Sequence, residues 1–230
     1  MRLFGHPRGA STRRVLLTLA EKGHQVELLE LDPYTGEHLR PEHLARHPFG
    51  KVPALEDGSF LLYEAGAITR YLDETLSGPR LIPASARDRA RMEQWLSSDA
   101  AYLTPALEPL LSQLVLHPMF GARPDPAEVQ RGRREVAEVL DVLERSFQLG
   151  DGAPFVAGAL FSLADIALAC SLQLLHDTRQ EDLFGARPQV ARWWTRVRSR
   201  PASQKVLGNA CSAGARGRLR AVAGGLAEAR

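Results

Sequence analysis

The segment from residue 47 to residue 72 constrains the fold more than any other part of this 230-residue chain. It reads HPFGKVPALEDGSFLLYEAGAITRYL, so a Val-Pro step precedes two short apolar runs and then a helical pattern. Asp57-Gly58 separates the two runs and is a signal for a two-residue hairpin turn. The pattern predicts a ββα unit, with strands at 52–55 and 59–63 and a helix at 64–76.

The residues before this unit predict a βαβ unit, with strands at 2–4 and 26–31 around a helix at 12–21. In that helix Val15, Leu16 and Leu19 fall on one face, as in a helix that lies on a sheet. Lys22-Gly23 then supplies a basic last turn and a glycine beyond the helix end. The adjacent Arg13 and Arg14 are expected to reach into water.

Strand-like patterns disappear after Ser77-Gly78-Pro79 and Ile82-Pro83. The remainder predicts a helical bundle: a long run bent at Pro105 and ended near His117-Pro118, then helices that begin at Pro126 and Ser162, and a last one before Pro201. We therefore predict a first domain at 1–78, a linker at 79–86, a helical domain at 87–208 and a flexible basic tail at 209–230.

The helix that begins at Ser162 carries a capping signature. Ser162 and Asp165 form an S-x-x-D box, and Phe161 and Ile166 have the spacing of a hydrophobic staple. We interpret Asp165 as a folding signal rather than a catalytic carboxylate.

Charge and cysteine usage exclude several function classes. The net charge is only +2, and the tail holds four arginines against one glutamate, so nucleic-acid binding by the body of the protein is not predicted. The start of the chain lacks the apolar core of a signal peptide, and no apolar run approaches the roughly 20 residues that span a bilayer. With two cysteines and no disulfide pattern, we expect a cytoplasmic protein without a membrane partner.

The Val-Pro step and the start of the following helix indicate a peptide-binding surface. Because Pro53 has no N–H and Val52 is biased to extended geometry, the donor and acceptor of Val52 stay available to a ligand, and a cis bond would aim both outward. Glu64-Ala65-Gly66 opens a helix whose amides are suited to an anion. His43 and His47 suggest a metal site, but Pro48 biases His47 away from helical geometry, so no metal site is predicted.

These motifs, preceded by TGEHLRPEHLARHPFG and GHPRGASTRRVLLTLAEKG, resemble the glutathione-binding domain of cytosolic glutathione transferases, closest to the phi-like group of plants and bacteria. The resemblance is strong over roughly the first eighty residues and looser beyond. It implies a thioredoxin-like N-terminal domain followed by an all-helical bundle, which is the glutathione transferase fold. It also implies a cytoplasmic homodimer that conjugates glutathione to small hydrophobic electrophiles in detoxification, with glutathione as co-substrate and no other cofactor.

By this resemblance Glu64 and Ala65 bind the γ-glutamyl end of glutathione, Val52 before Pro53 pairs with the cysteinyl backbone, and His38 and Lys51 hold the glycine carboxylate. Ala65 stands where a serine is usual, so one hydroxyl hydrogen bond is lost. The electrophile pocket is expected at the domain interface, a frequent place for small-molecule sites. Its candidate residues are Leu114, Leu116, Met119 and Phe120.

The catalytic hydroxyl is where this chain departs from the family. An unperturbed thiol with a pKa near 8.5 is only about 3% ionised at pH 7, so the enzyme must stabilise the thiolate. The family's serine stands two residues after the proline of GHP, and here that residue is Gly9. The hydroxyl of Ser11, that of Thr12, or the backbone amides of residues 10–12 remain as candidates, although a Ser-Thr pair here is also a typical helix cap. The alternatives are a non-catalytic protein that binds glutathione or hydrophobic ligands, and a glutathione-dependent peroxidase.

Overall fold

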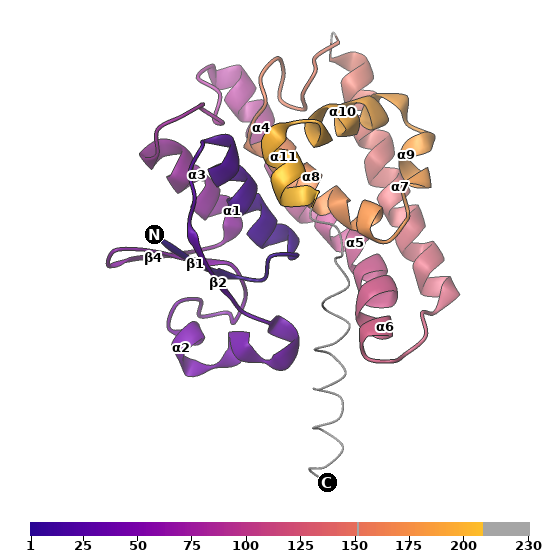
Figure 1. Cartoon of the computed structure of the whole chain (residues 1–230). Helices are drawn as coiled ribbons and strands as arrows, with labels where there is room; N and C mark the ends of the chain where they lie inside the picture. The colour runs from indigo at the N-terminus through magenta and orange to yellow at the C-terminus, as the bar shows by residue number, and fades with distance from the viewer. Residues whose placement is uncertain (151, 209–230) are drawn as a thin grey trace.

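The computed structural model describes residues 1–150 and 152–208, which form a small mixed sheet with its helices beside a larger group of helices (Figure 1). The sheet contains β1 (Arg2–Gly5), β2 (Glu27–Glu30), β3 (Ala54–Asp57) and β4 (Phe60–Tyr63) in the order β2-β1-β3-β4. β1 and β2 are parallel, whereas β3 is antiparallel to both of its neighbours. The predicted βαβ and ββα units and the predicted hairpin are therefore confirmed.

The strand register brings the segments that carry the predicted site residues to one edge of the sheet. Phe4 pairs with Ala54, and Ala54 pairs with Tyr63, so the end of β1, the start of β3 and the end of β4 lie together. The Val52-Pro53 bond is cis. β3 begins after this proline, two residues later than predicted, because proline has no N–H for the ladder.

Two helices cover one face of the sheet and a short helical segment lies on the other side (Figure 1). α1 (Ala10–Glu21) packs against α3 (Ala65–Thr75) over an apolar core. The buried residues of that core are Leu3, Val15, Leu19, Leu55, Ala65, Ile68 and Leu72. The segment on the opposite side consists of η1 (Pro33–Thr35), η2 (Glu37–Leu39) and α2 (Pro41–Leu44), a stretch in which the sequence pattern predicts neither a helix nor a strand.

The helical part begins with a nearly continuous run from residue 86 to residue 119. It comprises α4 (Ala86–Ser98), the π-helical η3 (Asp99–Leu103), α5 (Thr104–Leu111), the π-helical η4 (Ser112–Leu116) and α6 (His117–Met119). The run ends at Met119, close to the predicted end near His117-Pro118, and Pro118 lies in the first turn of α6.

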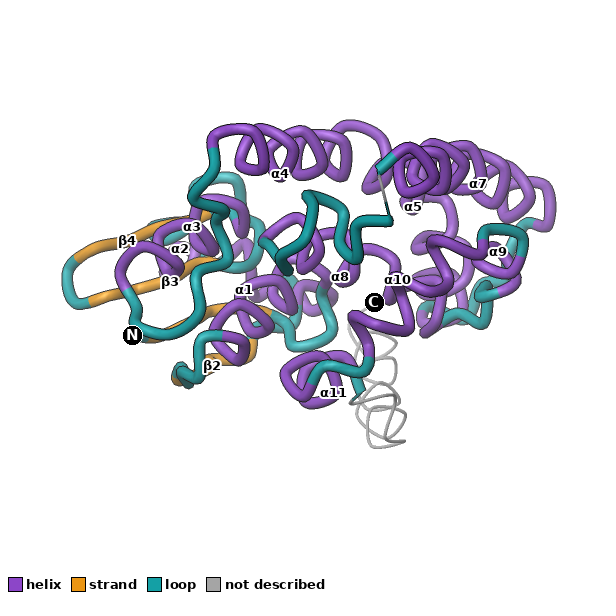
Figure 2. Tube along the Cα trace, turned by 90° about the horizontal axis from the view of Figure 1, so that it is seen from above, coloured by secondary structure: helices purple, strands orange, loops and turns teal. Residues whose placement is uncertain are grey.

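The remaining described helices include α8, which is buried along almost its whole length and packs against α1, α4, α5 and α10. They are α7 (Pro126–Leu149), α8 (Leu163–Asp177), α9 (Asp182–Gly185), α10 (Pro188–Arg198) and α11 (Pro201–Leu207). The capping box at Ser162 and Asp165 is present as predicted. Figure 2, seen from above, places α8 inside the group and α11 beside α1.

The two parts are joined along α1, which contacts both α8 and α11. Arg13 donates to Asp177 at 2.9 Å, and Arg14 forms an ion pair with the fully buried Asp99 at 2.6 Å. The expectation that both arginines reach into water is therefore wrong. A helix that packs between two domains buries some of its charged side chains, and a buried charge needs a partner of opposite charge.

A buried ion pair fixes the segment between the domains. Lys22 Nζ lies 3.0 Å from Asp73 Oδ1, and both side chains are almost fully buried. The Asp73 carboxylate also accepts hydrogen bonds from the amides of Leu81 and Ile82. Within residues 1–150 and 152–208 there is no helix long and apolar enough to cross a membrane, and the expected tail lies outside these ranges.

Candidate functional site

Two helices begin at the sheet edge where β1, β3 and β4 meet. α1 follows β1 through the loop from His6 to Gly9, and α3 follows β4 directly at Glu64. Pro53 immediately precedes β3 at the same edge, since Ala54 pairs with both Phe4 and Tyr63. The sequence-predicted residues at the starts of both helices and at the Val-Pro step are thus brought together by the strand register.

The start of α1 has no side-chain cap. Its N-cap is Gly9, with φ −69° and ψ 132°, and Gly9 donates its own amide to His6 O at 2.9 Å. The amides of Ala10, Ser11 and Thr12 therefore lack intrahelical acceptors. The expectation that Ser11 and Thr12 form the cap is wrong, because this turn starts the helix at Ala10 and places Ser11 inside the first turn.

The two candidate hydroxyls occupy different environments. Thr12 is fully buried, and its Oγ1 has no hydrogen-bond partner among the described residues. It packs so closely against β1 that a Cβ added at Gly5 would lie 2.6 Å from Thr12 Oγ1. Ser11 is only partly buried. Of these two hydroxyls, Ser11 is the one that a ligand at the helix start can approach.

The start of α3 is also uncapped, and its N-cap has an unusual backbone. Glu64 has φ 69°, which few residues other than glycine adopt, and its side chain is exposed. Its carbonyl accepts the amide of Ile68, whereas no side chain caps the helix. Such strain is found most often at binding sites, and here it presents a free carboxylate next to open amides. Ala65 is buried against the sheet and contributes its backbone to this turn.

The segment before β3 packs onto the end of β4. His43 Nε2 lies 2.7 Å from the carbonyl oxygen of Lys51, and the rings of His47 and Tyr63 are 4.8 Å apart. Burial lowers the pKa of His47. These contacts hold the backbone that leads into Pro53.

His43 and His47 lie on one helical turn, since His47 donates its amide to His43 O at 2.8 Å. The expectation that Pro48 would prevent this arrangement is wrong. Pro48 restricts only His47, and His47 is already the last residue of the turn. Within residues 1–150 and 152–208, no three His, Cys, Asp or Glu side chains gather as metal ligands.

The residues expected to hold the glycine carboxylate both lie between β2 and β3. His38 is partly buried in η2, and Lys51 is exposed just before the Val-Pro step. Gly50, at φ 56°, lets this loop pass closely over Leu39, where an added Cβ would lie 2.8 Å from the Leu39 side chain. The electrophile candidates lie on η4, on α6 and directly after it: Leu114, Leu116 and Met119 are partly buried, and Phe120, the residue after α6, is 68% exposed.

Two buried groups lie away from the sheet edge. Asp165 accepts hydrogen bonds from the amides of Val156 and Ser162, from the Ser162 hydroxyl and from Trp193 Nε1. Burial raises the pKa of its carboxyl, and these four donors oppose that shift. Cys170 is fully buried as well, which raises its pKa to about 12 and makes it an unreactive thiol.

Comparisons with known proteins match both domains. Residues 1–74 match the family description "Glutathione S-transferase, N-terminal domain", and residues 107–201 match "Glutathione S-transferase, C-terminal domain". The chain belongs to the glutathione S-transferase family. The probable glutathione S-transferase GSTF2 of Oryza sativa subsp. japonica is 36% identical over 207 residues, which cover 90% of this chain and 95% of the rice protein.

Solved structures agree with this assignment. Glutathione transferase F7 from Populus trichocarpa superposes with a TM-score of 0.82 at 33% identity, covering 89% of this chain and 96% of the poplar chain. Glutathione S-transferase I from maize, in complex with an atrazine glutathione conjugate, gives a TM-score of 0.81 at 32% identity and covers 90% and 96% of the two chains. This transferase is therefore an enzyme of the phi-like group, and the non-catalytic alternative is not favoured.

Proposed function

We propose that this transferase binds glutathione along the shared sheet edge, with its γ-glutamyl end at the open N-terminus of α3 and its cysteinyl thiol at that of α1. Glu64 pairs with the γ-glutamyl ammonium, and the amides that follow Ala65 receive its carboxylate. The backbone of Val52 before Pro53 pairs with the cysteinyl unit, as at a strand edge. Lys51 and His38 hold the glycine carboxylate. The uncapped start of α3 beneath the exposed, left-handed Glu64 is the observation that carries this proposal.

The thiolate then lies over the first turn of α1. Lowering a thiol pKa by two units requires about 2.7 kcal/mol of differential stabilisation. The amides of residues 10–12 and the hydroxyl of Ser11 supply hydrogen bonds and a helix dipole of about that size. Thr12, which is buried against β1, supports the first turn of α1 by packing and does not contact the sulfur. The thiolate attacks a small hydrophobic electrophile held beside Leu114, Leu116, Met119 and Phe120.

The thiol titration tests this assignment. Glutathione bound to the protein should ionise at a lower pH than free glutathione, as followed by the ultraviolet absorbance of the thiolate. Ser11→Ala should raise the pKa of the bound thiol, whereas Thr12→Val should change stability more than that pKa. If neither substitution moves the thiol titration, the amides alone stabilise the anion and the role of the Ser11 hydroxyl is wrong.

We propose residues 1–78 and 87–208 as the two domains and 79–86 as the linker. We also propose a cytoplasmic homodimer that serves in detoxification. Large exposed side chains support the dimer: Phe49, whose ring lies 6.2 Å from that of Tyr63 in β4, is 71% exposed, Phe60 and Leu61 of β4 are each 46% exposed, and Tyr102 of η3 is 65% exposed. Phe49→Asp should convert the dimer to monomers in analytical ultracentrifugation, and cell fractionation tests the compartment.

A further inference from the structure

The side chain of Arg70 reaches back by one turn along α3 to the second residue of that helix, Gly66. Arg70 Nη1 donates to Gly66 O at 2.8 Å, and a Cβ added at Gly66 would lie 3.3 Å from the same Nη1. Side chains on a helix lean toward its N-terminus, so residue 70 can place its charge beside the first turn. The guanidinium thus lies beside the backbone of Gly66, where a side chain on residue 66 would crowd it.

Glu93 of α4 holds this guanidinium from the helical domain. Arg70 Nε donates to Glu93 Oε1 at 3.1 Å, and Arg70 Nη2 donates to Glu93 Oε2. Such a bidentate pair fixes the orientation of the guanidinium as well as its position. The side chains of Arg70 and Glu93 are 35% and 44% exposed, and an ion pair that faces water adds little to stability. What the pair does is place a charge at the start of α3.

Arg70 keeps donors that a ligand can use. A guanidinium carries five N–H groups, and within residues 1–150 and 152–208 its bonds to Gly66 and Glu93 use three of them. The first amides of α3 also lack intrahelical acceptors, because no side chain caps this helix. A carboxylate bound at the start of α3 therefore meets open amides and a cation whose position is already fixed.

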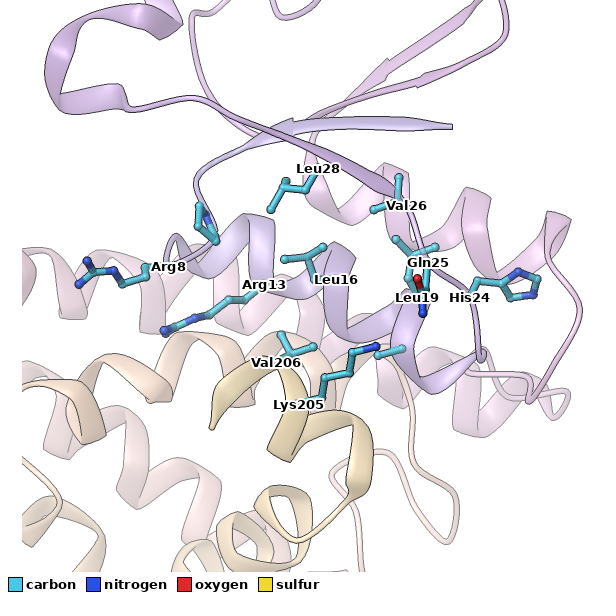
Figure 3. Close-up of a pocket in the computed structure, with 12 residues that line it drawn as sticks. Arg8, Arg13, Leu16, Leu19, His24, Gln25, Val26, Leu28, Lys205 and Val206 are labelled. Carbon is cyan, nitrogen blue, oxygen red and sulfur yellow. The ribbon is translucent and has the colours of Figure 1, made fainter. Parts of the chain in front are cut away.

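Other arginines of the first domain have different positions. Arg13 lies on the side of α1 that faces α11, where it lines a cavity between β2, α1 and α11 (Figure 3). Arg14 is paired with the buried Asp99 of η3, and Arg46 is paired with Glu56 of β3. Among these arginines, Arg70 is the one whose guanidinium lies on the first turn of α3.

We propose that Arg70 is a further glutathione-binding residue, which recognises the γ-glutamyl carboxylate, and that Glu93 is its positioning residue. This inference rests on the proposed function and extends it, since it makes a residue of the helical domain contribute to glutathione affinity. The bidentate Glu93 pair orients the guanidinium in advance, so that little freedom is lost when glutathione binds.

Isothermal titration calorimetry of the full chain with two ligands tests this assignment. One is glutathione, and the other carries a 4-aminobutanoyl group in place of the γ-glutamyl group, so that it lacks only that carboxylate. Arg70→Gln should weaken glutathione binding about tenfold and leave binding of the analogue within about twofold. Arg70→Lys and Glu93→Gln should each weaken glutathione binding about threefold, because the first loses the fork geometry and the second loses its orientation.

Matched variants control for charge and for folding. Arg87→Gln on α4 and Glu108→Gln on α5 make the same charge changes at exposed positions and should leave both affinities within about twofold. Thermal unfolding of each variant shows that it is folded.

The selective loss separates ligand recognition from a structural role. The inference is overturned if Arg70→Gln weakens both ligands equally, or if it weakens neither. In both of these cases glutathione still binds to the wild type and the proposed function stands. A wild type that does not bind glutathione would instead refute the proposed function and this inference together.

Discussion

The starts of α8 and α1 show opposite solutions to the same problem. Every helix begins with amides that lack intrahelical acceptors. At α8 the Ser162–Asp165 box satisfies them, and Asp165 also binds Val156 and Trp193 in the interior. At α1 the N-cap is a glycine without a side chain, and the first amides stay open.

This difference separates folding from binding. A capped, buried helix start has no donors left for a ligand, so its carboxylate stabilises the helical domain. An uncapped start at a sheet edge keeps its donors and its dipole for an anion from outside. α3 belongs with α1 in this respect, since Glu64 presents its carboxylate to solvent rather than to its own helix.

Asp165→Ala should have the largest effect and should act on stability alone. Four buried donors lose their acceptor, so we expect the free energy of unfolding to fall by about 3–5 kcal/mol. Urea denaturation measures this loss. Asp125→Ala removes the exposed cap of α7 and should cost only about 1 kcal/mol. Equal losses in the two variants would contradict the distinction between a buried capping network and an ordinary cap.

Glu64→Gln should act on binding and not on stability. Removing the carboxylate should weaken glutathione binding by about 2 kcal/mol, or roughly 30-fold, because a charge-assisted hydrogen bond is lost. Calorimetric titration with glutathione measures the change. Glu74→Gln makes the same charge change at an exposed position of α3 and should leave affinity unaltered. A fall in melting temperature without a change in affinity would mean that Glu64, like Asp165, stabilises the fold and does not bind glutathione.

Gly9→Ser adds a hydroxyl at the open start of α1 and should raise activity. The backbone of Gly9 suits any residue, and an added Cβ would lie 3.3 Å from His6 O, which requires a shift of a few tenths of an ångström. We expect kcat/KM for a chromogenic aryl halide to rise about tenfold, since one hydrogen bond to the thiolate is gained. Gly9→Ala controls for the Cβ. A serine variant no faster than the alanine variant would show that residue 9 does not face the sulfur.

The smallest expected effect is on the pH dependence of stability, through His47 in the loop that leads to Pro53. Because the folded-state pKa of His47 is lowered by burial, the unfolded chain binds this proton more readily. The contribution of His47 to stability is therefore complete above its ordinary pKa of 6.5 and is lost as the pH falls through the lowered value. His47→Phe should flatten the fall in melting temperature between pH 7 and pH 5. An unchanged slope in His47→Phe would contradict this assignment.

Much of the fold follows from local patterns. The hairpin at Asp57-Gly58, the capping box at Ser162 and the glycine stop at Gly23 each depend on residues that are neighbours in sequence, and the structure contains all three. The short helices α2, α9 and α11 were not predicted, because a helix of one or two turns has too few residues to show a period and is stabilised by tertiary packing.

The candidate site was predictable only in part. The ordered motifs around Pro53 and Glu64 indicated which residues gather, since the strand pairing that unites them follows from the ββα pattern. The burial of Thr12 could not be predicted from the sequence, because it depends on the close approach of α1 to Gly5. The partners of Arg13 and Arg14 lie more than 80 residues away in the chain, and no local pattern reports such a distance.

The contact between α1 and α11 has a consequence for biosynthesis. α11 ends at Leu207, which is fully buried, and Arg200 forms an ion pair with Glu21 at the end of α1. One side of α1 is thus covered by a segment that is translated much later, since Arg200 follows Glu21 by 179 residues. The nascent first domain exposes that side of α1 until α11 has been synthesised.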